Sequence, residues 1–211
     1  IIATVSSGYY EFDKANFDYG PIFSTFGFND VEGLRLRTGG RTYFGYNDPW
    51  RLEAYTAYGF KDRRFKYGIQ GKAILDKKSR LIISGGNRRD VEQIGASLTA
   101  STDVLGRSNG SSSIVGTGQN NRLTNVNLSK LSLEVEPLRN FVVSLSGSYK
   151  TLSSASELFS LDYNDADSPT GISSQVKQFE TIFTANYFPG RKVSGSGVER
   201  STNTDKLRNI F

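Results

Sequence analysis

The sequence predicts an all-β protein: an antiparallel transmembrane β-barrel, or a segment of a larger one, with about 10–11 strands in this chain. Three observations predict this fold class. Apolar and polar residues alternate with a period of two over segments of about ten residues, longer than the five or six of an average globular strand. No run of about 20 apolar residues is present, so only strands could cross a membrane. Long polar connections alternate with short turns.

Four alternating segments follow one another along the chain, at residues 34–44, 64–75, 141–150 and 178–187. Each has an apolar face of Leu, Ile, Val, Phe or Tyr broken by Gly, Ala and Thr, and an opposite face that is mostly polar or charged. Their apolar faces begin at Leu34, Phe65, Phe141 and Phe179. Each segment therefore predicts a strand with one apolar and one polar face.

The segment from 126 to 133 breaks this alternation. Val126 and Leu128 share one face, whereas Leu131 and Leu133 lie on the other. One extra residue in the strand would return both pairs to the same face. We therefore expect a β-bulge near Ser129.

Turn-forming residues separate the segments, at 29–30, 47–49, 61–62, 76–79, 136–137 and 189–190. Two other connections, near 105–121 and 152–175, are long and polar. Transmembrane barrels have short turns at their periplasmic end and longer loops outside. The order long, short, long, short in the second half of the chain favours this arrangement over a soluble β-sandwich.

The composition excludes several classes of chemistry. The chain of 211 residues has a net charge of +5, 12% aromatic residues, no Cys and no His. The aromatic content argues against disorder. Without Cys and His, the common zinc sites and the Ser-His-Asp triad cannot form. The Gly-x-Ser-x-Gly pattern at 106–110 therefore predicts a loop and not a catalytic nucleophile. We expect no enzyme activity, no catalytic residues and no cofactor.

An acidic stretch offers candidate cation ligands, namely Asp162, Asn164, Asp165 and Asp167. Its spacing departs from an EF-hand, because Ala166 occupies a ligand position and no closing Glu follows. Asp and Asn are also common turn formers. We therefore predict a surface loop and no metal site.

Six basic residues on polar strand faces are the candidate functional cluster: Arg35, Arg37, Arg41, Arg64, Lys66 and Lys72. In a barrel they would face the lumen, where polar side chains are the rule. They could select anions or hold a plug electrostatically. They could instead pair with Glu53, Glu180 or Asp18 and fill the interior, which is the reading we favour.

Basic and aromatic residues also interleave at 61–67, as they do in proteins that bind single-stranded nucleic acid. In a strand, Phe65 and Tyr67 lie on the opposite face from Arg64 and Lys66, so they cannot jointly line one stacking groove. We predict that the chain binds no nucleic acid.

An ordered set of motifs covers residues 18–95. It reads YGP at 19–21, FNDVEGLRLR at 28–37, GGRT at 39–42, AYGFKD at 57–62, FKYG at 65–68 and DVEQIG at 90–95. The set resembles a family of Bacteroidota outer-membrane proteins of unknown function, known as carboxypeptidase-like regulatory domain-containing proteins, in their C-terminal β-barrel region. The resemblance implies an integral position in the bacterial outer membrane and no catalytic residue. The family's N-terminal sandwich domain is missing and 211 residues are short for its barrel, so we expect residues 1–211 to be an incomplete barrel region.

These observations lead us to expect a non-enzymatic, integral outer-membrane protein that takes part in transport across, or assembly of, the bacterial outer membrane, alone or in a larger envelope complex. The expected partners are outer-membrane lipid, lipopolysaccharide and other outer-membrane or periplasmic envelope proteins. A soluble β-sandwich binding module is the alternative. The apolar faces hold few large aliphatic side chains for a dense core, which favours the barrel. An enzyme acting through paired carboxylates is a third hypothesis, which no residue pattern supports.

Overall fold

The computed structural model describes residues 9–42, 45, 47–93, 105, 123–156, 159–166 and 168–204. Within these ranges the chain forms antiparallel strands and two short 3₁₀ helices, η1 (Asp13–Ala15) and η2 (Ile22–Ser24), without any α-helix. The predicted all-β, antiparallel class is therefore confirmed. No helix among the described residues is long and apolar enough to span a membrane.

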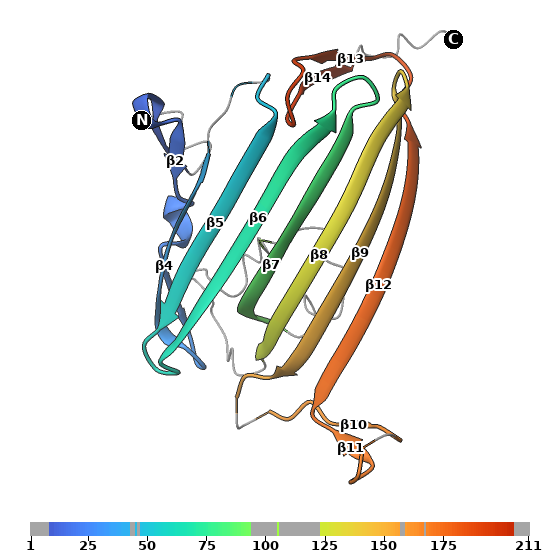
Figure 1. Cartoon of the computed structure of the whole chain (residues 1–211). Helices are drawn as coiled ribbons and strands as arrows, with labels where there is room; N and C mark the ends of the chain where they lie inside the picture. The colour runs from blue at the N-terminus through green and yellow to red at the C-terminus, as the bar shows by residue number, and fades with distance from the viewer. Residues whose placement is uncertain are drawn as a thin grey trace, which may run out of the picture.

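One ten-stranded sheet dominates the structure (Figure 1). Its strands run in the order β1-β2-β4-β5-β6-β7-β8-β9-β12, with β3 beside β4. Their bounds are β1 (Tyr10–Phe12), β2 (Phe17–Tyr19), β3 (Phe26–Asn29), β4 (Gly33–Thr42), β5 (Trp50–Gly59), β6 (Arg64–Asp76), β7 (Leu81–Gln93), β8 (Leu123–Leu138), β9 (Phe141–Ser154) and β12 (Gln175–Tyr187). Figure 1 shows the long strands side by side in one curved layer. β1 and β12 lie at opposite edges and do not pair, so the described residues form an open sheet and not a closed barrel.

Two small hairpins accompany the large sheet. β10 (Tyr163–Asn164) pairs with β11 (Ile172–Ser173), and β13 (Arg191–Ser194) pairs with β14 (Ser201–Thr204). The first hairpin lies inside the predicted long loop at 152–175, where β9 itself continues to Ser154. Of the predicted loop at 105–121, the structure describes only Leu105. The Gly-x-Ser-x-Gly pattern at 106–110 lies outside the described residues.

Strand register gives the large sheet two different faces, because directly opposed residues point to the same side. On one side, Tyr58 opposes Phe65, and Leu145 opposes both Leu133 and Phe183. We call this side the apolar face. On the other side, which we call the polar face, Arg41 opposes Glu53. A row of Ser in β9 (Ser144, Ser146 and Ser148) opposes Glu134, Ser132 and Lys130 of β8 on the same face.

The bulge predicted near Ser129 is wrong. β7 and β8 pair without interruption from Gln93–Leu123 to Ile82–Glu134. The register shift in β8 lies instead between Val135 and Leu138, opposite β9. Pro137 falls in that interval, where its missing N–H costs the ladder no hydrogen bond. The turn predicted at 136–137 is accordingly shifted, and β8 and β9 are joined at residues 139–140.

The alternation in β8 changes for a different reason, because its two apolar pairs belong to different faces. Val126 and Leu128 lie on the polar face and form a buried cluster with Leu152. Leu131 and Leu133 lie on the apolar face and are exposed. A small apolar core therefore occupies one part of the polar face.

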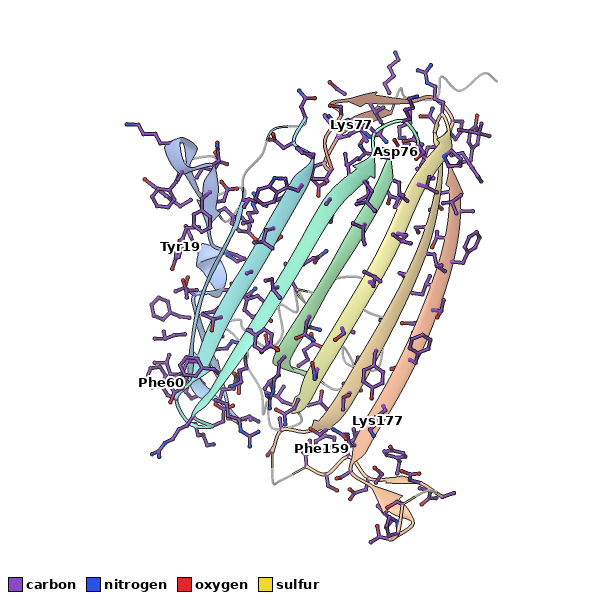
Figure 2. The ribbon with its side chains drawn as sticks, in the orientation of Figure 1. Tyr19, Phe60, Asp76, Lys77, Phe159 and Lys177 are labelled. Carbon is purple, nitrogen blue, oxygen red and sulfur yellow. The ribbon has the colours of Figure 1, made fainter. Side chains whose placement is uncertain are left out.

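The two ends of the sheet differ in their connections. Residues 77–80, 139–140 and 188–190 join or leave strands at one end, which we call the turn end. The long connections 94–122 and 155–174 belong to the other end, which we call the loop end. In Figure 2, Asp76 and Lys77 mark the turn end at the top, and Phe159 and Lys177 mark the loop end at the bottom.

Candidate functional site

The apolar face is the largest candidate surface, because its big side chains are not covered. Phe179 and Phe65 are 74% and 73% exposed, and other exposed members are Ile69, Leu131, Leu145, Tyr149, Phe183 and Tyr187. Soluble monomers rarely expose a continuous apolar patch of more than a few hundred Å². Exposed apolar surfaces of this kind are typical of proteins that use them to contact lipid or another protein.

The exposed apolar side chains form a band with defined limits. Tyr149 opposes Phe179 near its loop-end limit, and Phe141 opposes Tyr187 at its turn-end limit. At about 3.3 Å per residue, the stretch from Phe141 to Tyr149 rises by roughly 26 Å along the strand, or roughly 20 Å at a tilt of about 40°. Membrane barrels have an apolar band about 25 Å tall with aromatic residues at both limits. Beyond Tyr149, the same face of β9 continues with Thr151 and Ser153.

The polar face holds a buried ionic network centred on Arg35 of β4. Its Nη1 and Nη2 atoms donate to the two carboxylate oxygens of Asp90 in β7 at 2.7 and 2.9 Å. Nη1 also lies 3.0 Å from Oε1 of Glu32. The hydroxyl group of Tyr55 in β5 donates to Asp90 at 2.6 Å. Arg35 is only 1% exposed, so these charges are compensated by each other and not by bulk water.

Glu32, in the turn between β3 and β4, extends this network to β6. Its carboxylate accepts hydrogen bonds from Nδ2 of Asn29 at 2.7 Å and forms an ion pair with Nζ of Lys66 at 2.6 Å. Lys66 also pairs with Asp62 in the next turn. The network thus joins two turns and five strands, β3 to β7, at the loop end of the sheet.

Three neighbouring contacts involve other charged residues of the polar face. The Arg37 guanidinium lies 3.8 Å from the centre of the Tyr55 ring, a cation–π geometry. Arg88 forms an ion pair with Glu92, and both are buried. Nearer the turn end, Nε of Arg41 donates to Asp18 at 2.8 Å.

The structure places all six predicted basic residues on the polar face, but it does not gather them into one cluster. Arg35 and Lys66 meet in the ionic network, and Arg41 and Lys72 pair with Asp18 and Glu199. In the described part of the chain, Arg37 and Arg64 form no ion pair. Most of the predicted cations are therefore neutralised by carboxylates and not offered to a diffusing anion.

Of the three predicted acidic partners, only Asp18 forms an ion pair with one of the six basic residues in the described part of the chain. Asp18 pairs with Arg41 as suggested, whereas Glu53 accepts a hydrogen bond from the Tyr9 hydroxyl group at 2.9 Å. Glu180 forms no ion pair with any described residue. Neither of the main acceptors, Glu32 and Asp90, is among the predicted partners. The only signal was that Asp90 and Glu92 alternate on one strand face within the DVEQIG motif.

Each carboxylate of the ionic network already has a cationic partner. Removing one partner would leave an uncompensated buried charge. Among the described residues, no group of three or more Asp and Glu side chains could hold a metal ion. Asp167 of the acidic stretch at 162–167 lies outside the described residues. The network therefore acts as a cross-link between strands.

Comparison with known proteins gives one match. Residues 2–151 match the model of the C-terminal domain of a family of unknown function (DUF5686), a range that includes the whole ionic network and strands β1 to β8. No curated protein and no solved structure matches the chain. The predicted resemblance to a family of unknown function is confirmed at this level. The Bacteroidota origin, the outer-membrane location and the carboxypeptidase-like description stay predictions.

Proposed function

We propose that this chain, which belongs to the DUF5686 C-terminal domain family, forms part of an integral β-barrel of the bacterial outer membrane. In this proposal the protein is not an enzyme. It takes part in transport across, or assembly of, the outer membrane, alone or in a larger envelope complex. Its partners are membrane lipid, lipopolysaccharide and other envelope proteins.

The observation that carries the proposal is the inverted distribution of side chains over the sheet. Large aromatic side chains such as Phe65 and Phe179 are exposed, whereas Glu32, Arg35 and Arg88 are buried. A soluble sheet buries its apolar face and leaves charges in water. A barrel in a membrane has the reverse arrangement, because lipid covers the apolar face and polar groups fill the interior.

The β-sandwich alternative has less support. A sandwich needs a second sheet packed about 10 Å from the apolar face. Among the described residues, the only other sheets are the two-stranded hairpins β10–β11 and β13–β14. Neither is large enough to cover strands β4 to β12.

The roles in transport or assembly follow from where the polar groups lie. On the polar face, the ion pairs of Arg35 and Lys66 stiffen the interior near the loop end. The loop end, where β7 and β9 end and where the charged turns of Glu32 and Asp62 lie, is the side on which the protein would meet cargo or partner proteins. This part of the proposal rests on the barrel and falls with it.

A fluorescence experiment tests the membrane contact directly. Trp50 is the single tryptophan of the chain, lies on the apolar face opposite Ala73 and is about half exposed. In liposomes that contain brominated phospholipid, we expect its emission to be quenched. The matched control combines Trp50→Phe with Gln70→Trp, which moves the indole to the polar face and should escape quenching. Equal quenching of both reporters, or of neither, would refute the proposed lipid-facing surface.

A further inference from the structure

A cavity of about 370 Å³ lies at the turn end, away from the ionic network. It is bounded by the turn after β6, the turn after β8 and the segment 195–200, which we call the strap. Its lining includes Lys77, Lys78, Arg80, Glu136, Arg139 and Arg200. Cavities of roughly 300–1,000 Å³ are typical of sites for small ligands.

The strap forms one wall of the cavity through specific contacts. Arg80 donates to the carbonyl oxygens of Gly197 at 2.7 Å and Val198 at 3.0 Å. The Val198 amide donates to the carbonyl oxygen of Asp48 at 2.9 Å. Gly197 also lies close to Asp48, so that a Cβ atom at position 197 would stand 2.6 Å from the Asp48 backbone. The wall is therefore held by backbone contacts at positions that accept little change.

The charges around the cavity do not balance. Five of the lining side chains named above are cationic and one, Glu136, is anionic. That carboxylate is already engaged by Arg191 at 2.9 Å and by Arg200. The nearby Asp76 is engaged by its own turn, where it accepts hydrogen bonds from Ser79. The cavity thus keeps a surplus of positive charge.

Arg80 shows the effect of this surplus most clearly. It is partly buried and, in the described part of the chain, donates to carbonyl oxygens without an ion pair to any carboxylate. Burial and then the positive charge of Arg200 lower its pKa, against the opposing effect of Glu134 and Glu136. An anion in the cavity would relieve this repulsion. Lys77, Lys78 and Arg139 likewise form no ion pair with described residues and border the same cavity.

We propose that this cavity binds a phosphate-bearing anion. Arg guanidinium groups hold phosphate oxygens in paired hydrogen bonds, and Lys ammonium groups add charge. The ligand can be a free phosphate or the headgroup of an anionic phospholipid, since both present the same oxygens. The inference stands apart from the barrel proposal, because the cavity is built by turns and the strap.

The test uses the full chain in uncharged detergent and two probes, inorganic phosphate and short-chain phosphatidylglycerol, titrated by calorimetry at constant ionic strength. The binding variant combines Lys77→Gln, Lys78→Gln and Arg139→Gln, three exposed positions outside the strap contacts. We expect it to weaken binding by about tenfold or more. The matched control combines Arg64→Gln, Arg89→Gln and Lys177→Gln, three exposed cations toward the loop end, and should bind as the unchanged chain does.

Each outcome decides the proposal. Binding of both probes, or of one, supports it and identifies the source: lipid alone points to a headgroup, and phosphate alone to a free anion. Absence of binding for both probes overturns it. Equal weakening in the binding variant and the control also overturns it, because the attraction would then be a property of net charge. If the triple variant is poorly folded, Lys78→Gln alone should still weaken binding measurably, and unchanged binding in that single variant counts against the site.

Discussion

A single arginine placed on the apolar face would test the lipid-facing surface by its energetic cost. Ile69 lies at the centre of the apolar row of β6, opposite Ala54 and Asn87, and is 44% exposed. It is roughly 13 Å along the strand from Phe65 on one side and from Ala73 on the other. This position is near the middle of the band, where Arg on the lipid side costs about 2–4 kcal/mol. We expect Ile69→Arg to lower the free energy of unfolding in liposomes by about that amount.

Gln70 provides the matched control one residue further along the same strand. Its side chain lies on the polar face, opposite Glu53 and Gly86. An arginine at this position gains an acidic neighbour and stays away from lipid. We expect Gln70→Arg to change the free energy of unfolding by no more than about 0.5 kcal/mol, as for an ordinary polar-surface change.

Urea titration in liposomes, followed by the emission of Trp50, measures both variants with the same probe. Equal losses, or a loss below about 0.5 kcal/mol for Ile69→Arg, would refute the reasoning, because a half-exposed isoleucine in water tolerates arginine. A larger loss for Gln70→Arg than for Ile69→Arg would assign lipid to the opposite face.

Three other substitutions test the remaining features. Leu152→Ala opens a hole in the fully buried cluster on the polar face and should cost about 2–5 kcal/mol in urea unfolding. Asp90→Asn removes the negative charge that compensates the buried Arg35 and should cost about 3–5 kcal/mol in the same assay, whereas Asp162→Asn in the exposed loop should cost almost nothing. At the turn end, the Glu136 carboxylate pairs with Arg191 at 2.9 Å and with Arg200 of the strap. Glu136→Gln removes the negative charge that both guanidinium groups share and should loosen the docking of the strap. Limited proteolysis of the strap measures this loss.

Each of these three predictions has a result that would contradict it. Leu152→Ala at unchanged stability would show that the cluster on the polar face is not packed. An equal effect of Asp90→Asn and Asp162→Asn would remove the argument for a buried network. Strap cleavage in Glu136→Gln at the rate of the unchanged chain would show that the ion pairs of Glu136 do not hold the strap.

The faces of the long strands could be predicted from the sequence because alternation is a local property. Phe65 and Ile69 share a face whatever the rest of the chain does, since side chains in a strand alternate with a period of two. The prediction of a bulge was wrong in β8, because both faces of this strand carry apolar side chains. Alternation around Leu128 and Leu131 cannot tell a bulge from a buried cluster, because the difference depends on whether Leu152 packs on the polar side.

The ionic network was beyond prediction for a different reason. Arg35 and Asp90 are far apart in the sequence, and their contact depends on the registers of β4, β5, β6 and β7 together. A shift of one residue in any of these pairings would send one partner to the opposite face. The strap is equally non-local, because Arg80 meets Gly197 only through the folded turn end.

The order of strands in the sheet also has a consequence for the rate and route of folding. From β4 to β7 each strand pairs with its sequence neighbour across a short connection, and the same is true of β8 and β9. Such hairpins close small loops and form within microseconds when isolated. β7 and β8 must instead meet across residues 94–122. Loop closure costs only about 0.6 kcal/mol for each doubling of length, or roughly 2 kcal/mol more than for a four-residue turn. The docking of one preformed half of the sheet onto the other is therefore the expected slow step, and substitutions along the β7–β8 seam should retard folding more than those within either half.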